Sequence, residues 1–245
     1  MKLKILGILP ARLDSTRLPK KMLDPISGKP LIYWSWKQAM KAKLPDQILI
    51  ATDSKIIFDI VKSFGARVVM TPQNINCGSD RVAYAAKHFK DFKPSIVVNI
   101  QGDEPLMPPS AIDKSIKALI TDKSAVVSTP ATPFKNKKDL ESPNFVKVVL
   151  DKNNHALLFS RSVLPFPRDP YDKYLKHLGL YAYRADFLEK YTKWKQTPLE
   201  KAEKLEQLRI MENGYKISVV VDSFPNMEVN TKEELNRARR MITKK

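Results

Sequence analysis

Short apolar runs alternate with segments of helical periodicity along the first half of the chain, and this alternation constrains the fold more than any other feature. The runs at 3–9, 47–52 and 95–100 have the length and continuity of buried strands. Between the first two, residues 31–43 repeat apolar positions at helical spacing, and residues 55–64 do so after the second. Strand, helix and strand in this order predict βαβ units, and hence a largely parallel sheet wrapped by helices. The remaining elements expected here are a strand at 67–70 and helices at 80–88 and 109–121.

The pattern changes after about residue 124. Strand-like segments at 125–132, 146–150 and 176–183 are separated by proline-bearing loops, which predicts an antiparallel excursion. The last expected elements are a helix at 198–213, a strand at 217–221 and a helix to about 242 that opens on a capping box, Thr231 with Glu234. No linker is visible. The prediction is therefore one α/β domain over 1–245, with a first half at 1–124 and a second half at 125–245.

Composition excludes several classes of protein. A single cysteine among 245 residues, Cys77, cannot close an intrachain disulfide, which favours a reducing compartment. No apolar run approaches the roughly 18 residues of a membrane span, so no membrane insertion is expected. The net charge of +17 favours anionic partners. Because the basic residues are scattered and no aromatic-interleaved basic stripe or zinc spacing is found, nucleic acid is not expected as a partner.

The loop after the first strand concentrates positive charge. Arg12, Arg17, Lys20 and Lys21 fall within it, and no glycine does. In open α/β sheets ligands bind beyond the carboxyl ends of the strands, where four cations suit a polyphosphate. Side chains rather than a glycine-rich turn would then hold the phosphates. The alternative is a solvated basic loop in a basic protein.

A second candidate segment follows the apolar run at 95–100. Asp103 stands just after it, where a parallel sheet places a carboxylate at its ligand-binding edge. Oxygen ligands of this kind suit Mg²⁺ bound together with nucleotide phosphates. Gly102 beside it would let the backbone approach a ligand closely. The alternative is an ordinary acidic turn after a strand.

With these motifs in place, the chain resembles the CMP-Kdo synthetases, the 3-deoxy-manno-octulosonate cytidylyltransferases, over nearly its whole length. The resemblance depends on many short runs that occur in the same order. They are Pro10-Ala11-Arg12, Ser15-Thr16-Arg17-Leu18-Pro19, Gly28-Lys29-Pro30, Ala51-Thr52-Asp53, Gly78-Ser79-Asp80-Arg81, Gln101-Gly102-Asp103-Glu104-Pro105, Val146-Lys147-Val148-Val149, Phe159-Ser160-Arg161-Ser162, Lys176-His177-Leu178-Gly179-Leu180-Tyr181 and Leu205-Glu206-Gln207-Leu208-Arg209.

The resemblance implies a GT-A-like, Rossmann-type fold and a cytidylyltransferase that joins CMP from CTP to Kdo for lipopolysaccharide synthesis. It further implies Mg²⁺, a homodimer and a cytoplasmic location. Catalysis would involve Arg12, Arg17, Lys21 and Asp103. The CTP site would comprise Pro10, Ala11, Arg12, Ser15, Arg17, Lys21, Thr71, Gly78, Ser79, Arg81 and Gln101. The sugar-acid site would comprise Gln101, Arg161, His177, Tyr181, Glu206 and Gln207.

Each sugar-site residue also has a structural alternative. Tyr181 in an alternating strand could belong to the core, and His177 could be a surface residue. Glu206 and Gln207 could form the solvated face of a helix. From the residue types alone these alternatives stay open.

The chain departs from the family pattern at three positions. Lys20 stands where the family usually has glycine, and Cys77 replaces a small polar residue and is interpreted as a packing residue. Asn230 replaces the family's second metal-binding aspartate, which makes the metal set Asp103 with Asn230. Asn230 could instead only cap the final helix. The substrate could therefore be another acid, such as 8-amino-Kdo, or the chain could be a catalytically impaired binding homologue.

Overall fold

A parallel sheet forms around the first apolar run of the chain. β1 (Ile5–Ala11) pairs with β4 (Gln47–Thr52) on one side and with β6 (Ile96–Asn99) on the other, and β5 (Arg67–Met70) pairs with β4. All three pairings are parallel. Nearly all of β1 is buried, which explains why this strand appears in the sequence as a continuous apolar run rather than as an alternating one.

The computed structural model describes residues 3–13, 18–75, 77–90, 92–225 and 227–243. Within it the chain divides into two compact units. Unit 1 is Met1–Asp113 with Pro225–Lys245, and unit 2 is Lys114–Phe224. The sequence predicted one domain with halves that meet after residue 124. The observed division falls earlier, inside α4 (Pro109–Thr121), and the C-terminal segment belongs to unit 1.

Three helices connect the strands of unit 1: α1 (Leu31–Ala39), α2 (Lys55–Ser63) and α3 (Gly78–His88). α1 ends four residues earlier than the helix predicted at 31–43. After α1 the amides of Lys41 and Ala42 donate to carbonyl oxygens only three residues back, and the carboxylate of Asp113 accepts from the amides of Lys43, at 2.9 and 3.0 Å, and of Leu44, at 2.9 Å. These amides are bound in a turn and cannot continue the helix.

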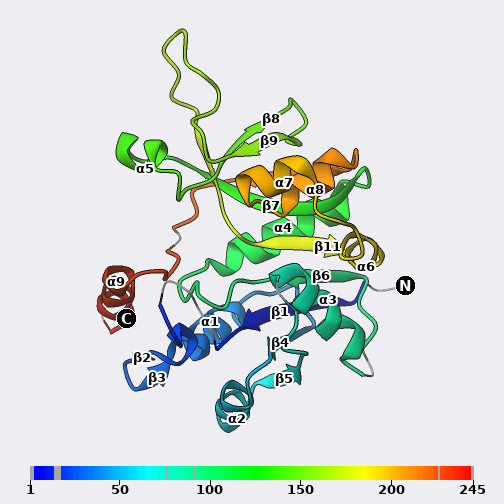
Figure 1. Ribbon diagram of the computed structural model, residues 1–245, viewed down its shortest axis with the longest axis vertical. Helices are drawn as coiled ribbons and strands as arrows, with labels where there is room; N and C mark the ends of the chain where they lie inside the picture. Colours follow the sequence, from blue (N-terminus) through cyan, green and yellow to red (C-terminus); the bar gives the residue numbers. More distant parts are fainter. Residues whose placement is uncertain (1–2, 14–17, 76, 91, 226, 244–245) are drawn as a thin grey trace. The chain divides into compact units, whose positions relative to one another are not determined.

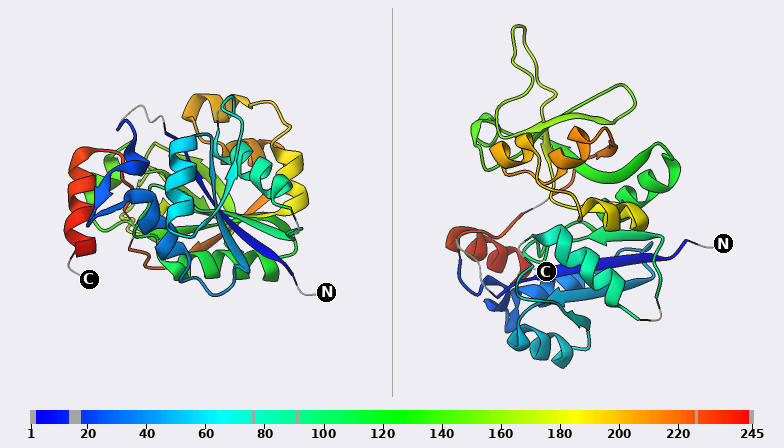
Figure 2. Two further views of the ribbon diagram at one scale, coloured as in Figure 1. Left: turned by 90° about the horizontal axis from the view of Figure 1, so that it is seen from below. Right: turned by 45° about the vertical axis from the view of Figure 1, so that its right-hand side comes forward.

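The C-terminal helix packs on a small hairpin of unit 1. The chain passes through a short 3₁₀ turn, η1 (Lys21–Leu23), into β2 (Pro25–Ile26) and β3 (Lys29–Pro30). α9 (Lys232–Thr243) lies beside this hairpin in all views (Figure 1 and Figure 2). Arg239 Nε donates to the carbonyl oxygen of Pro25 at 3.0 Å. Residues from the two ends of the chain thus meet in one unit.

Unit 2 is organised around β7 (Ala125–Pro133). β12 (Lys216–Val221) pairs with it in parallel, whereas β11 (Tyr181–Arg184) and β10 (Leu175–His177) pair with it in antiparallel fashion. The remaining antiparallel strands are β8 (Lys147–Leu150), which pairs with β10, and β9 (Ala156–Ser160), which pairs with β8. The predicted antiparallel excursion is confirmed. Between β9 and β10 the chain forms a long loop that extends away from these strands (Figure 2).

Two elements predicted as continuous are broken. The strand expected at 176–183 is interrupted between β10 and β11, where Leu178 N donates to Pro130 O at 3.0 Å and Leu180 N to Leu178 O at 2.8 Å. The helix expected at 198–213 is divided into α7 (Pro198–Glu203) and α8 (Gln207–Glu212). Lys204 between them has φ of 55°, a left-handed conformation that ends a helix.

Several short elements were not predicted. They are η1, β2, β3, β9, α5 (Lys137–Glu141) and α6 (Ala185–Tyr191). In the part of the chain that the structure describes, no helix is both long enough and apolar enough to cross a membrane.

Candidate active site

Gly102 and Asp103 follow β6 at the carboxyl end of the parallel sheet. A Cβ atom on Gly102 would lie 2.7 Å from the carbonyl oxygen of Pro10, which only glycine avoids. Ser35 Oγ donates to the carbonyl oxygen of Gly102 at 2.7 Å and fixes the turn. The glycine therefore permits the ends of β1 and β6 to approach each other, a structural reason different from the ligand contact that the sequence suggested.

The ammonium group of Lys21 connects three elements of unit 1. Its Nζ donates to Asp103 Oδ2 at 2.5 Å, to the carbonyl oxygen of Val229 at 3.0 Å and to Asn230 Oδ1 at 3.1 Å. An ammonium has three hydrogens, so these three acceptors use all of them. Lys21 is only 7% exposed, although it lies in a loop predicted to bind phosphate. The structure places it between the two predicted metal ligands.

Asn230 does not cap the last helix. The cap of α9 is Thr231, whose Oγ1 accepts from Glu234 N at 3.2 Å while Glu234 Oε2 accepts from Thr231 N at 2.9 Å. This is the capping box predicted from the sequence, and it is confirmed. Because Asn230 Oδ1 accepts from Lys21 instead, the capping explanation for this residue is wrong.

Asp103 and Asn230 supply one carboxylate and one amide oxygen at the same ammonium. Within residues 3–13, 18–75, 77–90, 92–225 and 227–243, no group of three His, Cys, Asp or Glu side chains could hold a metal ion. Mg²⁺ is commonly held by one or two protein oxygens and completed by phosphates and water, and this pair fits that pattern. The charges of Lys21 and Asp103 cancel, so the three side chains have a net charge of zero and attract a free cation weakly.

A second polar cluster of unit 1 surrounds Arg81, which is fully buried. Its guanidinium donates to Asp53 Oδ2 at 2.6 Å, to the carbonyl oxygen of Ile75 at 3.0 Å and to Thr71 Oγ1. Burial lowers the pKa of Arg81, and Asp53 opposes that shift by stabilising the charged form. Arg12 also donates to the carbonyl oxygen of Ile75, at 3.0 Å. The predicted CTP residues Arg12, Thr71 and Arg81 therefore lie together.

The first turn of α3 begins at two other predicted CTP residues, Gly78 and Ser79. Cys77 precedes them and caps the helix, because its Sγ accepts from Asp80 N at 3.3 Å. It is thus more than a packing residue. The amide groups of a helix N-terminus favour an anion nearby.

The other predicted residues of the nucleotide site divide into two groups. Pro10 and Ala11 form the end of β1, and Gln101 follows β6. Ser15 and Arg17 lie outside the described residues.

Unit 2 brings together three of the predicted sugar-site residues. His177 on β10 and Tyr181 on β11 have ring centroids 5.3 Å apart. Burial, with Tyr183 and Glu206 adding to it, raises the pKa of Tyr181 well above its usual range. Burial also lowers the pKa of His177 to about 3, so its ring is neutral. A neutral imidazole and a phenol near the Glu206 carboxylate form a hydrogen-bonding surface suited to hydroxyl groups.

Gln207 begins α8, directly after the break that was not predicted. It is only 4% exposed, and its Nε2 has no hydrogen-bond partner among the described residues. A buried amide without a partner costs about 1–3 kcal/mol. A ligand that accepts from Nε2 would remove that cost.

Arg161 is engaged with the protein itself. Its Nε donates to the carbonyl oxygen of Glu203 at 2.8 Å and its Nη1 to the carbonyl oxygen of Pro143 at 2.8 Å. The Glu203 carboxylate also accepts from the backbone N of Arg161 at 3.0 Å. The family resemblance assigns Arg161 to the sugar-acid site. Two of its five donor hydrogens are instead used within unit 2.

The sequence analysis assigned no role to three residues of these clusters. Asp53 follows a buried strand just as Asp103 does, and that shared pattern could have identified it. Thr129, which accepts from or donates to His177, lies in a strand whose pattern gives no sign of this contact. Glu203 precedes the break at Lys204, and no sequence pattern indicates its contact with Arg161.

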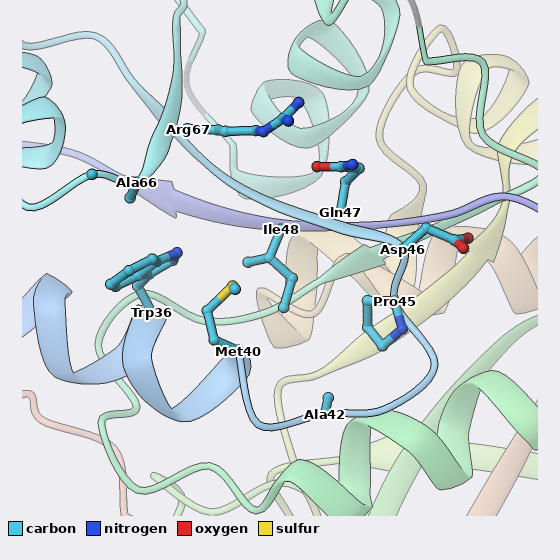
Figure 3. Close-up of a pocket in the computed structure, with 10 residues that line it drawn as sticks. Trp36, Met40, Ala42, Pro45, Asp46, Gln47, Ile48, Ala66 and Arg67 are labelled. Atoms are coloured by element: carbon cyan, nitrogen blue, oxygen red, sulfur yellow. The ribbon is translucent and has the colours of Figure 1, made fainter.

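A cavity of about 180 Å³ lies elsewhere in unit 1, at the amino ends of β4 and β5 (Figure 3). Trp36 of α1 and Met40, which follows that helix, point into it, and Gln47 and Arg67 border it. It contains none of the predicted site residues. Since ligands of open α/β sheets bind at the carboxyl ends of strands, this cavity lies at the opposite edge from the expected nucleotide site.

Comparison with known proteins identifies the family. A family model described as "Cytidylyltransferase" matches residues 6–217. The 3-deoxy-manno-octulosonate cytidylyltransferase of Chloroherpeton thalassium is 42% identical, with 99% of each chain covered. That of Francisella tularensis subsp. novicida is 45% identical, with 96% of this chain and 97% of its own covered.

Solved structures agree with this result. A structure of CMP:2-keto-3-deoxy-manno-octonic acid synthetase complexed with CTP superposes with a TM-score of 0.93 at 32% identity, covering 98% of this chain and 99% of the other. A cytidylyltransferase from Leptospira borgpetersenii shares the fold, with a TM-score of 0.66 at 15% identity over 100% of this chain and 88% of its own. The chain therefore belongs to the cytidylyltransferase family, among the 3-deoxy-manno-octulosonate cytidylyltransferases.

Proposed function

We propose that the chain transfers CMP from CTP to the anomeric hydroxyl of Kdo and releases pyrophosphate, for lipopolysaccharide synthesis. One observation carries the proposal: Lys21, Asp103 and Asn230 meet at the carboxyl end of the parallel sheet. This edge is where open α/β sheets bind nucleotides. The names of relatives that match over 96% or more of the chain give the substrates.

In this reaction the anomeric oxygen of the sugar attacks the α-phosphorus of CTP. The bond from that phosphorus to the β-phosphate bridging oxygen breaks, pyrophosphate leaves, and the hydroxyl proton passes to solvent. Arg12, Arg17 and Lys21 stabilise the charge on the leaving pyrophosphate. To do so, Lys21 exchanges part of its contact with Asp103 for a phosphate oxygen. No covalent intermediate with the protein is needed.

Asp103 and Asn230 would hold Mg²⁺ together with the phosphates of CTP. When bound, this ion lowers the pKa of the attacking hydroxyl and offsets negative charge at the phosphates. The protein's own contribution is to hold both oxygens at one place through Lys21 and through the backbone, since Val229 N donates to the carbonyl oxygen of Asp103 at 3.0 Å.

The remaining assignments follow the same proposal. Thr71, Gly78, Ser79 and Arg81 surround cytosine and ribose, with Pro10, Ala11 and Ser15 along the phosphates. Gln101, Arg161, His177, Tyr181, Glu206 and Gln207 hold the sugar acid. A homodimer and a cytoplasmic location stay predictions.

The test is release of pyrophosphate from CTP and sugar, with the product identified by mass. CTP with Kdo should be turned over, whereas other nucleoside triphosphates and neutral sugars should not. Asp103→Asn should lower kcat by about 100-fold or more. Turnover of a neutral sugar 1-phosphate without turnover of Kdo would overturn the proposal. Faster turnover of 8-amino-Kdo than of Kdo would keep the reaction and change the substrate.

A further inference from the structure

One hydroxyl group of unit 2 lies beside the ring of His177. Thr129 on β7 is fully buried, and its Oγ1 is 2.9 Å from His177 Nε2. The same oxygen is 2.7 Å from the carbonyl oxygen of Leu180 and 3.2 Å from that of Leu178. These contacts occupy the break between β10 and β11, so the interruption of the predicted strand is what brings both carbonyls to Thr129.

The hydrogen count at Thr129 determines which atom donates. A hydroxyl has one hydrogen, and a carbonyl oxygen can only accept. If the hydroxyl donated to His177 instead, the oxygens of Thr129 and Leu180 would face each other at 2.7 Å with no hydrogen between them, so the Thr129 hydrogen is assigned to the carbonyl of Leu180. The contact with His177 then needs a hydrogen on Nε2, because two lone pairs would otherwise face each other at 2.9 Å.

The ring of His177 carries no second hydrogen. Burial lowers its pKa to about 3, which leaves one N–H on the neutral imidazole. Its ring neighbours, Phe159 at 4.9 Å and Tyr181 at 5.3 Å between centroids, are both uncharged, since burial raises the pKa of Tyr181. With Nε2 protonated, Nδ1 has only a lone pair. It has no hydrogen-bond partner within the described residues.

We propose that Thr129 is a positioning residue that holds His177 as the Nε2–H tautomer, so that Nδ1 accepts a hydrogen bond from a hydroxyl of the sugar. This inference rests on the proposed function, because it assumes that His177 faces the sugar acid. It extends that function by stating which chemical group the histidine recognises. Thr129 itself need not touch the substrate.

The tautomer determines which chemical groups the sugar site can bind beside His177. An acceptor nitrogen pairs with a hydroxyl or ammonium group and repels a carboxylate or phosphate oxygen. The carboxylate of the sugar acid must therefore bind elsewhere, and an analogue that lacks the hydroxyl at this place loses its partner. A site that hydrogen-bonds a substrate hydroxyl discriminates strongly against analogues without it.

The tautomer can be observed directly. The chain has three histidines, so a long-range ¹H–¹⁵N spectrum of the native protein resolves each ring, and His177→Gln identifies the signal. We expect a protonated Nε2 and an unprotonated Nδ1 on His177 between about pH 5.5 and pH 8. His88, which is exposed on α3, provides a reference in the same spectrum. An Nδ1–H tautomer or an imidazolium at His177 would overturn the proposal.

Variants then test the role of Thr129. Thr129→Val removes the hydroxyl at nearly constant shape, and we expect a mixture of His177 tautomers and a roughly tenfold higher KM for the sugar acid. KM for CTP should stay within about twofold. Thr129→Ser should restore both the tautomer and KM. Ser128→Ala is the matched control, because Ser128 is equally buried on β7 and donates to Ser115 instead. It should change neither the tautomer nor KM.

The outcomes separate this proposal from the function it rests on. If Thr129→Val does not fold, the native spectrum and the serine variant still decide the tautomer. Absence of turnover with any sugar acid would contradict the proposed function and leave the tautomer measurement intact. Turnover of Kdo with an unchanged tautomer and KM in Thr129→Val would contradict only the role given to Thr129.

Discussion

Lys21 Nζ lies 2.5 Å from Asp103 Oδ2, and the two side chains are only 9% and 14% exposed. The ammonium thus neutralises the one carboxylate predicted to hold a metal. Asn230 contributes an amide oxygen to the same group and no charge. A hard cation would be recruited mainly by the phosphates that arrive with CTP.

Asn230→Asp should make the metal easier to bind. The change adds a full negative charge at nearly constant shape, next to an ammonium that has only one carboxylate partner. We expect less Mg²⁺ to be needed for half-maximal rate, and a rate higher by on the order of tenfold, about 1.4 kcal/mol of barrier. Initial rates measured across a magnesium titration test this.

Asn236→Asp is the matched control for that experiment. Asn236 is exposed on α9 of the same unit, so the variant adds the same charge away from Lys21. Superimposable titrations of native protein and Asn230→Asp would show that Asn230 is not a metal ligand. A faster native enzyme would show that Asn230 suits a substrate other than Kdo.

Lys20→Gly should stabilise unit 1. Lys20 has φ of 57°, a left-handed conformation that costs a side-chain-bearing residue about 1–2 kcal/mol and that glycine adopts freely. Part of that gain is offset by the greater freedom of glycine in the unfolded chain, so we expect up to about 1 kcal/mol. Urea denaturation measures it. Lys29→Gly, on β3 without a positive φ, should instead lose about 0.5–1 kcal/mol.

Asp53→Ala should destabilise the protein by about 3 kcal/mol, because it leaves the buried guanidinium of Arg81 without its carboxylate. Asp59→Ala provides the comparison. It removes an ion pair with Lys55 in which both side chains are more than half exposed, and should cost less than about 0.5 kcal/mol. Equal losses in the two variants, measured by urea denaturation, would contradict the structural role given to Asp53.

Gln207→Leu should separate stability from sugar binding. It removes a buried N–H that has no partner in the described structure, so the free energy of unfolding should stay equal or rise by about 1 kcal/mol. KM for the sugar acid should rise by about tenfold, while KM for CTP stays unchanged. Gln196→Leu, at an exposed position before α7, should leave both KM values unchanged. An unchanged KM for the sugar in Gln207→Leu would exclude this residue from the sugar site.

The strands of unit 1 could be predicted because burial on both faces leaves each of them a continuous apolar run. Asp103 could be placed for a related reason, since parallel strands present their carboxyl ends at one edge. The break at Lys204 could not be predicted, because apolar residues such as Leu205 and Leu208 continue the helical spacing across it. The spacing of apolar residues does not indicate that a lysine adopts a left-handed backbone conformation.

The other unpredicted features are side-chain contacts between residues far apart in the sequence. The loop was correctly recognised as unusually basic, yet the sequence did not predict that Lys21 would be bound by Asp103 and Asn230. His177 was identified through the family motif, but its partner Thr129 lies 48 positions away in another strand. Side-chain partners at such separations are determined by packing, which local patterns do not encode.

The hydrogen bond from Lys21 to Asn230 joins residues 209 positions apart, and all of unit 2 lies between them in the sequence. During synthesis, unit 2 emerges whole before residue 230 does. A chain synthesised only as far as Phe224 contains the sequence of every strand but leaves the Lys21 ammonium without two of its three acceptors. The cluster of Lys21, Asp103 and Asn230 is therefore assembled only after unit 2 has been synthesised, so the proposed nucleotide site depends on the segment that follows unit 2.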